Sequence, residues 1–387
     1  MQEAYIVDAV RTAGGRRNGK LSTIHPVELG AIVINSLLER TGIDPNIIDD
    51  VIIGCVTQAG EQTFGFARNI VLASNLPEHV PAVTIDRQCG SSQQALHFAV
   101  QCVMSGTQDV VIAGGVESMS RVPMFSNIEL YKKANLNFDP LSAHIKQRYG
   151  VDSFSQFKGA ELLSKKYGFS RDDLDNFAYE SHLKAIEATE QSLFDNEIVP
   201  VKLSDGSLHR SDEGIRFDVS LDSIAKVDTL AENGVITAAN ASQICDGASG
   251  LMVVSEKILK QFNLKPIARV INMTVIGSDP VIMLEGPIPA TKKALQKAGI
   301  SIQDIDLYEV NEAFAPVPLA WLQALNADPN KLNIQGGAIA LGHALGSTGS
   351  RIASTLVHSL RRNNYKYGLQ AICEGGGMSN VTIYEKC

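Results

Sequence analysis

This sequence has few aromatic residues, no long apolar run and no excess of positive charge. No apolar stretch approaches the roughly 20 residues that a membrane-spanning helix needs, so no membrane span is expected. Aromatic residues make up 6% of the 387 residues, and the 42 acidic residues outnumber the 34 Lys and Arg, for a net charge of −8. Because a general nucleic-acid binder gains affinity by neutralising phosphates, this balance predicts a protein that does not bind nucleic acid.

Cysteine is also scarce, and its spacing fits neither a disulfide framework nor a metal site. The six cysteines are Cys55, Cys89, Cys102, Cys245, Cys373 and Cys387. No pair has the C-x-x-C spacing of zinc ligands, and the density is far below that of disulfide-stapled proteins. We interpret them as reduced thiols of a cytoplasmic protein without a bound metal. The acidic, strand-like N-terminus lacks the features of a signal peptide, and the final Y-E-K-C is not a peroxisomal address.

Short apolar runs alternate with helix-periodic stretches along much of the chain. Strands are expected at 4–10, 50–56, 82–86 and 108–115, with helices at 26–40, 64–74 and 89–105. Alternation of this kind predicts an α/β fold with a mostly parallel sheet and helices on its faces. The continuous apolar runs suit strands that are covered on both sides.

The same order of elements recurs near the C-terminus, which indicates two similar halves. Helices are expected there at 288–298, 313–325 and 346–362, and strands at 268–277, 305–310, 332–335 and 369–373. At an offset of 257 residues, five of twelve aligned positions are identical between L-E-R-T-G-I-D-P-N-I-I-D and L-Q-K-A-G-I-S-I-Q-D-I-D. The repeat pairs helix 89–105 with helix 346–362 and predicts that both lie buried between the sheets of the two halves.

Residues 118–248 are more polar than the two halves and have a less regular pattern of apolar residues. We interpret them as a large insertion that covers a site. The predicted domains are a first half at 1–117 that is completed by about 249–264, an inserted loop domain at 118–248, and a second half at 265–387.

The stretch T-I-D-R-Q-C-G-S-S-Q-Q-A at 84–95 is the first candidate for chemistry, because a strand breaks there into small polar residues before a helix. Cys89 stands at the break. A cysteine in the first turn of a helix lies among unpaired N–H groups, which favour the thiolate. The sequence therefore offers Cys89 as a nucleophile, and the alternative is a small buried apolar residue.

Two polar motifs follow in the second half. Y-E-V-N-E-A-F-A-P ends a strand with Asn311 and Glu312, which either start the next helix as caps or face a ligand at the strand end. Q-G-G-A-I-A-L-G-H-A-L-G-S-T-G lacks the spacing of a dinucleotide site but holds His343 on a glycine-walled turn. A lone histidine is more often structural, yet this setting makes His343 the best general-base candidate of the chain.

A second cysteine ends a buried strand in A-I-C-E-G-G-G-M-S-N. Cys373 is followed there by three glycines. With Cys89 and His343 it fits chemistry that needs one sulfur nucleophile and one sulfur acid or base. The competing interpretation, a redox pair, is disfavoured by the lack of C-x-x-C spacing.

These motifs together resemble the thiolase family, the acetyl-CoA acetyltransferases and 3-ketoacyl-CoA thiolases. The motifs, in the family's order, are Q-C-G-S-S-Q-Q-A, N-E-A-F, G-G-A-I-A-L-G-H and C-E-G-G-G-M, and V-I-T-A-A-N-A-S-Q-I-C-D-G-A at 235–248 is similar to the stretch against pantetheine. The resemblance covers the whole chain. It implies a thiolase-like fold of two βαβ-rich halves with mixed sheets packed around central helices, plus the inserted loop domain.

The resemblance also implies roles for the motif residues. Cys89 would be the nucleophile that becomes acylated, and His343 would activate it. Cys373 would move the α-proton, and Asn311 would hold a water that stabilises the thioester oxygen together with His343. Backbone N–H groups of Cys89 and Gly375 would form a second oxyanion hole, and no metal is needed.

Coenzyme A is expected as a substrate, with no cofactor bound permanently. The resemblance implies that Arg216 lies near the nucleotide and Ala238 and Ser242 near pantetheine. Short-chain biosynthetic enzymes read H-M-G-x-x-A-E where this chain has S-Q-F-K-G-A-E, so Ser155 and Gln156 replace bulkier neighbours of the acyl group.

The resulting prediction is a degradative thiolase (3-ketoacyl-CoA + CoA ⇌ acyl-CoA + acetyl-CoA) for medium or bulky acyl groups. Alternatives are a short-chain acetoacetyl-CoA thiolase, a decarboxylating condensing enzyme, which would lack the second cysteine, and a non-catalytic CoA- or lipid-binding protein of the same fold. The expected partners are CoA, acyl-CoA and 3-ketoacyl-CoA, a second copy in a homodimer or homotetramer, and a β-oxidation enzyme.

Overall fold

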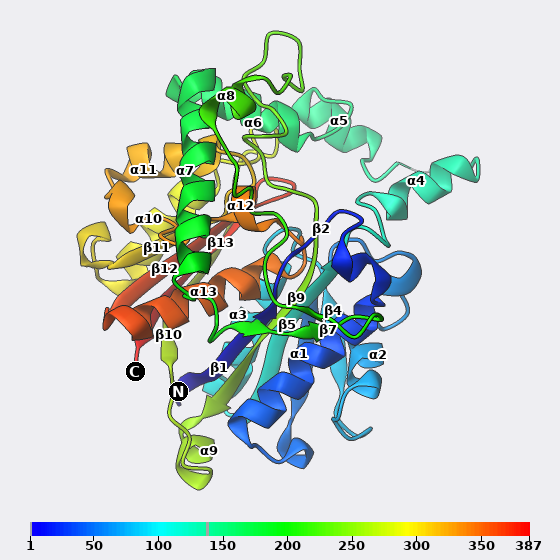
Figure 1. Cartoon of the computed structure of the whole chain (residues 1–387), viewed down its shortest axis with the longest axis vertical. Coiled ribbons are helices and arrows are strands. Elements are labelled where there is room, and N and C mark those ends of the chain that lie inside the picture. Colours follow the sequence, from blue (N-terminus) through cyan, green and yellow to red (C-terminus); the bar gives the residue numbers. More distant parts are fainter. Residues whose placement is uncertain (1, 137–138) are drawn as a thin grey trace.

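The computed structural model describes residues 2–136 and 139–387, in which strands and helices alternate as predicted (Figure 1). The strands are β1 (Ala4–Thr12), β2 (Gly15–Arg16), β3 (Asp50–Gly54), β4 (Ala82–Ile85), β5 (Val110–Ser118), β6 (Ile198–Val199), β7 (Val201–Lys202), β8 (Leu208–His209), β9 (Cys245–Ser255), β10 (Ala268–Gly277), β11 (Leu307–Val310), β12 (Tyr367–Glu374) and β13 (Met378–Lys386). The helices are α1 (Pro26–Thr41), α2 (Phe66–Ala73), α3 (Ser91–Ser105), α4 (Ser126–Lys133), α5 (Ala143–Tyr149), α6 (Gln156–Tyr167), α7 (Arg171–Glu190), α8 (Leu221–Ala225), α9 (Glu256–Gln261), α10 (Pro287–Ala298), α11 (Pro316–Leu325), α12 (Ala338–Leu341) and α13 (Thr348–Asn363).

The two halves build the same strand pattern. The first half has the order β1-β9-β5-β3, and the second has β10-β13-β12-β11. In both, the last two strands of the series are parallel and the other neighbours are antiparallel. The starts of β3 and β11, and of β5 and β12, are each separated by 257 residues. The predicted repeat is therefore confirmed.

The strands of the two halves join edge to edge. A short antiparallel contact pairs Tyr5 and Ile6 of β1 with Arg269 and Ala268 of β10. Through this contact the described strands form one continuous mixed sheet of 11 strands, apart from the β7–β8 hairpin. The sheets that were expected to face each other are thus linked through the first strand of each half.

Helices α3 and α13 lie side by side against the strands of both halves, as the repeat predicts (Figure 1). Their shared core contains Ala99 and Val103 of α3 and Leu356 and Leu360 of α13, all buried. The N-terminal turns come especially close, because a Cβ on Gly349 would lie 2.2 Å from the backbone nitrogen of Gln93. Glycine there lets the two helix starts meet, and the loops that precede these helices hold Cys89 and His343.

One predicted strand is absent, and four helices begin two or three residues later than predicted: α2, α3, α11 and α13. Residues 332–335 form only an isolated bridge, Leu332 to Tyr308, instead of a strand. A positive φ of 43° at Asn333 turns the chain away from extended geometry, and the side chain of Asn333 bonds to Val310 instead. Helix α11 begins at Pro316, three residues later than predicted.

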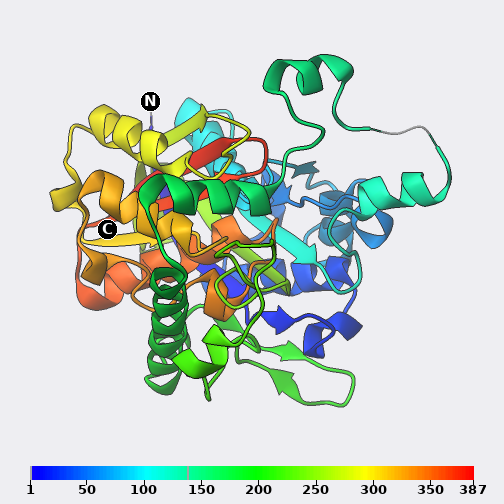
Figure 2. The same cartoon turned by 90° about the horizontal axis from the view of Figure 1, so that it is seen from above.

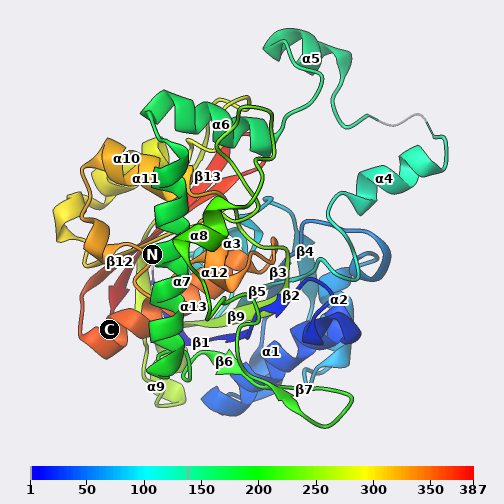
Figure 3. The same ribbon diagram turned by 45° about the horizontal axis from the view of Figure 1, so that its top comes forward.

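The segment between β5 and β9 contains helices α4 to α8 and the short strands β6 to β8. Viewed from above, α6 and α7 lie against the second half, whereas α4 and α5 project away from the body (Figures 2 and 3). Strand β6 of this segment pairs with β1, so the segment also extends the main sheet. The domain boundaries drawn from the sequence stay a prediction. No helix among the described residues has the length and apolarity to cross a membrane.

Candidate active site

Cys89 lies in a tight turn between β4 and α3, buried to 9% exposure. The preceding residue, Gln88, has a left-handed φ of 49°, which is strained for a residue with a Cβ and reverses the chain within one residue. Gly90 follows as the N-cap of the helix. A Cβ on Gly90 would lie 1.9 Å from Oε1 of Glu374, so glycine is required where the turn meets the end of β12.

The expectation of a thiolate at Cys89 is wrong for the free protein. Helix α3 begins at Ser91, so Cys89 precedes the turn whose N–H groups would stabilise the anion. Burial, with the nearby Glu374 carboxyl, raises the pKa of Cys89 to about 12. The residue is therefore a thiol at neutral pH and requires a base at the moment of attack.

His343 is buried and has a defined tautomer. Its Nδ1 lies 2.6 Å from Oγ1 of Thr348, and that hydroxyl donates its single proton to the carbonyl of Ala344 at 2.9 Å. Oγ1 must therefore accept from Nδ1–H, which places the lone pair on Nε2. Burial and the charge of Arg351 lower the pKa of His343 to about 3. The imidazole is neutral at pH 7 and available as a base through Nε2.

Asn311 lies directly after β11 and contacts His343. Its Nδ2 lies 3.5 Å from Nε2 of His343, and its Oδ1 is buried without a partner among the described residues. Because α11 starts only at Pro316, Asn311 does not cap that helix. Glu312 instead accepts from Ser181 of α7 and from the backbone of Ile339, which fastens the inserted segment to the His343 loop.

Cys373 lies in β12, one residue before its end, and is 1% exposed. Burial raises its pKa well above the ordinary value, with a further contribution from Cys89. The turn to β13 needs glycine, because φ is 79° at Gly376 and 76° at Gly377. The adjoining Gly375 lies against Gln88, since a Cβ there would lie 2.7 Å from Oε1 of Gln88. The Cys89 and Gly375 turns therefore touch.

A pocket of about 500 Å³ opens at His343, whereas Cys89, Asn311 and Cys373 are not among the residues that line it. It is lined by Arg16, Arg17, Met119, Met124, Gln156, Phe157, Leu230, Ala238, Ala241, Ser242, Gln243, Ile244, Ala313, Phe314, His343 and Leu345. The sequence-predicted residues Gln156, Ala238, Ser242 and His343 are thus brought together. Backbone bonds from Ser242 to Ala313 (3.0 Å) and from His343 to Gln243 (3.0 Å) fix the wall.

Two predicted substrate residues lie outside this wall. Ser155 is the N-cap of α6, and its hydroxyl accepts from the backbone of Lys158. Its neighbours Gln156 and Phe157 line the pocket in its place. Arg216 lines an adjoining hollow of about 630 Å³, which shares Arg16 with the pocket.

The sequence reasoning missed Glu117 and Thr348. Glu117, fully buried at the end of β5, accepts from the backbone of Val56, Thr57 and Gly346 at 2.9 to 3.0 Å. It thereby joins a first-half loop to the loop that carries His343. The available signal was an acidic residue in the apolar strand of the first half, V-V-I-A-G-G-V-E.

We expect Thr348→Val to lower kcat by about 10-fold or more with little change in KM, since the isosteric change removes the acceptor that fixes His343. Steady-state kinetics of Thr348→Val and Thr348→Ser would measure this. The serine variant keeps the hydroxyl and is expected to retain most of the activity. An unchanged kcat in the valine variant would contradict the positioning role.

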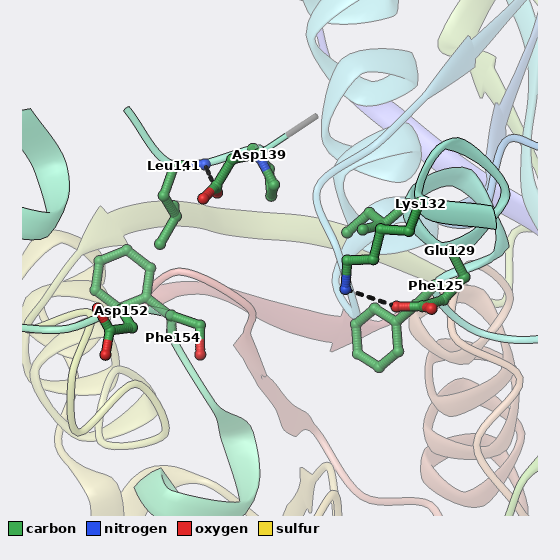
Figure 4. Close-up of a pocket in the computed structure, with 10 residues that line it drawn as sticks. Phe125, Glu129, Lys132, Asp139, Leu141, Asp152 and Phe154 are labelled. Carbon is green, nitrogen blue, oxygen red and sulfur yellow. Dashed lines mark hydrogen bonds and ion pairs between the residues drawn. The ribbon is translucent and has the colours of Figure 1, made fainter. Parts of the chain in front are cut away.

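A second hollow, of about 420 Å³, lies apart from these residues (Figure 4). It separates α4 from the segment that precedes α6, and the side chains of Phe125 and Phe154 face it from the two sides. Lys132 and Glu129 form an exposed ion pair of 2.8 Å at its edge. It shares no lining residue with the pocket at His343.

Comparisons with known proteins agree with the geometry. The descriptions "Thiolase, N-terminal domain" and "Thiolase, C-terminal domain" match residues 4–257 and 264–386. The chain is 49% identical to the steroid 3-ketoacyl-CoA thiolase of Mycobacterium tuberculosis, with 100% of this chain and 95% of the relative covered. It is 38% identical to the 3-ketoacyl-CoA thiolase of Bacillus subtilis, with both chains covered to 100%. The crystal structure of the Bacillus anthracis acetyl-CoA acetyltransferase superposes with a TM-score of 0.90 at 34% identity, covering 100% of this chain and 99% of that one. The chain belongs to the thiolase family.

Proposed function

We propose that this thiolase works in the degradative direction, cleaving 3-ketoacyl-CoA thioesters that carry medium-length or bulky acyl groups. The observation that supports this most is the way Cys89 and His343 approach one pocket of about 500 Å³: His343 lines it together with Met119 and Leu345, which pack in the same cluster as Cys89. The turn that follows Cys373 touches the Cys89 turn, and Asn311 contacts His343. Two thiols and a neutral imidazole supply the groups that the two half-reactions need.

In the first half-reaction, the sulfur of Cys89 attacks the 3-keto carbon while Nε2 of His343 takes its proton. The bond between C2 and C3 breaks, and the thiol of Cys373 protonates C2 of the departing acetyl-CoA. In the second, the thiolate of Cys373 takes the proton of CoA, whose sulfur attacks the acyl-Cys89 thioester. Acyl-CoA leaves, and His343 returns its proton to Cys89, which regenerates the enzyme.

Both steps place negative charge on a thioester oxygen in a buried site, where fixed donors have large effects. Asn311 holds its Nδ2 at His343 and leaves its buried Oδ1 unpartnered, which suits a residue that positions a water beside that oxygen. The touching turns of Cys89 and Gly375 support the assignment of their backbone N–H groups to a second oxyanion hole.

For CoA, we assign Ser242 and Ala238 to the pantetheine arm, because both line the pocket that ends at His343. Arg216 is assigned to the phosphates of the nucleotide, since it lies in the adjoining hollow that shares Arg16 and Gln243. Apart from CoA as a substrate, we propose no cofactor. We propose a cytoplasmic location.

The expected acyl preference is tested by a chain-length series. We expect kcat/KM for thiolysis to rise from acetoacetyl-CoA to medium-chain or branched 3-ketoacyl-CoA, because each methylene buried against the apolar wall adds about 0.8 kcal/mol. Phe157 packs edge to face on Phe314 with ring centroids 5.6 Å apart, Leu230 is half exposed, and all three line the pocket. The steroid thiolase named among the relatives supports a large acyl group.

A profile that peaks at acetoacetyl-CoA and falls with each added carbon would instead favour the short-chain biosynthetic reaction. The structural similarity to an acetyl-CoA acetyltransferase keeps that second candidate open. The decarboxylating and non-catalytic alternatives are disfavoured by the presence of a second cysteine, Cys373, whose following turn touches the Cys89 turn at Gln88.

We also propose that the protein is at least a homodimer. Strand β4 is the last strand of the sheet, and Val83 on it is 45% exposed, so an unpaired apolar edge faces outward. Leu130 and Leu136, both 55% exposed on the arm of α4, add further apolar surface for a tetramer or for a β-oxidation enzyme. Light scattering at micromolar concentration is expected to give a dimer mass or more, and a monomer would contradict the proposal.

A further inference from the structure

We propose that Arg17 binds a carboxylate at the far end of the acyl group. The preferred substrates are then 3-ketoacyl-CoA thioesters whose acyl chain ends in an anionic group, and not simple fatty acyl chains. This inference rests on the proposed thiolase function and specifies the substrate class of the same pocket.

Arg17 lines the pocket and is held there by its neighbours in the chain. The backbone N–H of Asn18 donates to Oγ of Ser120 at 2.8 Å, and Arg16 pairs with Cys245 in the β2–β9 ladder. Next to Ser120 stands Met119, which packs in the same buried cluster as Cys89. Arg17 therefore lies on a fixed stretch of backbone beside the wall that is continuous with the nucleophile.

In the part of the chain that the structure describes, no acidic side chain pairs with the guanidinium of Arg17. No hydrogen bond or ion pair joins Arg17 to another residue in the part of the chain that the structure describes, whereas Arg11 and Arg121 nearby are ion-paired with Asp212 and Glu61. None of the residues that line the pocket is acidic, and most are apolar. On the same turn, Glu213 accepts from the backbone N–H groups of Arg16 and Lys20. The exposed guanidinium of Arg17 is therefore left to attract an anion over the mostly apolar wall.

The phosphates of CoA are the other source of negative charge. Arg16 lines both the pocket and the hollow that holds Arg216, whereas Arg17 lines the pocket alone. Arg16 and Arg216 thus suit the nucleotide phosphates, and Arg17 remains for an anion that arrives with the acyl chain. Arginine also suits a carboxylate, because its planar guanidinium can donate two parallel hydrogen bonds to the two carboxylate oxygens.

The test compares substrates that share CoA and carbon number and differ only at the chain end, such as 3-oxohexanedioyl-CoA against 3-oxohexanoyl-CoA and the same pair with two and four more carbons. In the unmodified enzyme we expect kcat/KM to favour the carboxylate-ended member of at least one pair by about 10-fold or more. Raising the salt concentration should reduce that preference, because the site is partly open to solvent.

Arg17→Met, which keeps the apolar stem and removes the charge, should abolish the preference by lowering kcat/KM for the carboxylate-ended substrates about 10-fold more than for the methyl-ended ones. Arg17→Lys should retain part of it. Arg361→Ala, which removes an exposed arginine outside both hollows, is the matched control and should change neither substrate.

Three outcomes would overturn the proposal. Equal rates for both chain ends in the unmodified enzyme at every length would exclude a carboxylate site. An equal loss for both ends in Arg17→Met would assign Arg17 to CoA. A carboxylate preference that survives in Arg17→Met would place the anion site elsewhere. Absence of thiolysis with every substrate is a different result, since it would refute the proposed function itself.

Discussion

Cys89→Ala is expected to abolish thiolysis, with a fall in kcat of about 10⁴-fold or more, because no second nucleophile can carry the acyl group. The unmodified enzyme, mixed with acetyl-CoA in the absence of free CoA, should gain one acetyl group per chain. Intact-mass spectrometry measures that adduct, and peptide mapping should locate it at Cys89. The burial of Cys89 and the neutral state of its thiol restrict reaction to a substrate that also reaches His343.

Cys387→Ala is the matched control for this experiment. Cys387 is the exposed cysteine at the end of the chain and lies outside the pocket lining, so the variant should acetylate and turn over normally. An acetyl adduct of undiminished yield on Cys89→Ala would show that the nucleophile has been assigned wrongly.

Cys373→Ala is expected to separate acyl transfer from proton transfer. The variant should still acetylate Cys89 from acetyl-CoA, because His343 and the Cys89 turn are unchanged. It should lose exchange of the acetyl α-protons with deuterated water, and thiolysis should fall by about 10²- to 10⁴-fold, the usual contribution of a general acid or base. Proton NMR of acetyl-CoA incubated with the enzyme measures the exchange.

The burial of Cys373 is the reason for expecting it to act as a proton donor. A thiol with a raised pKa holds its proton until a strong base, such as the carbanion of acetyl-CoA, is generated beside it. Cys102→Ala, at a half-buried cysteine on the far part of α3, serves as the control and should exchange normally. Normal exchange in Cys373→Ala would assign the proton transfer to another group.

Local patterns were enough for much of the fold. The alternation of apolar runs with helix-periodic stretches predicted the elements, and the offset of 257 residues predicted the two halves, because side-chain periodicity reports directly on which face of an element is buried. The prediction failed where a side chain replaced backbone pairing. At Asn333 the amide bonds to Val310 and the chain turns, which no apolar pattern signals.

The candidate site was likewise predictable in part from local patterns. The motifs around Cys89, Asn311, His343 and Cys373 were recognisable one by one, since each needs small residues or glycines at fixed local spacing. Their meeting was predicted only indirectly, from the paired central helices and from the resemblance, because the four lie up to 284 residues apart. The junction of α3 and α13, where Ser350 N–H donates to Oγ of Ser92 at 2.9 Å, brings their loops together.

The sequence by itself determined which residues carry the chemistry, that the chain has two similar halves, and the family. Each of these depends on residues at fixed, short spacing along the chain. The tertiary structure alone decided the protonation states. Burial makes Cys89 a thiol and His343 a neutral base, although the helix argument predicted a thiolate, because desolvation depends on residues that are distant in the chain. It also decided that Thr348 fixes the tautomer of His343 and that Arg17 stands unpaired at the acyl pocket, since both depend on which loops the packed core brings side by side.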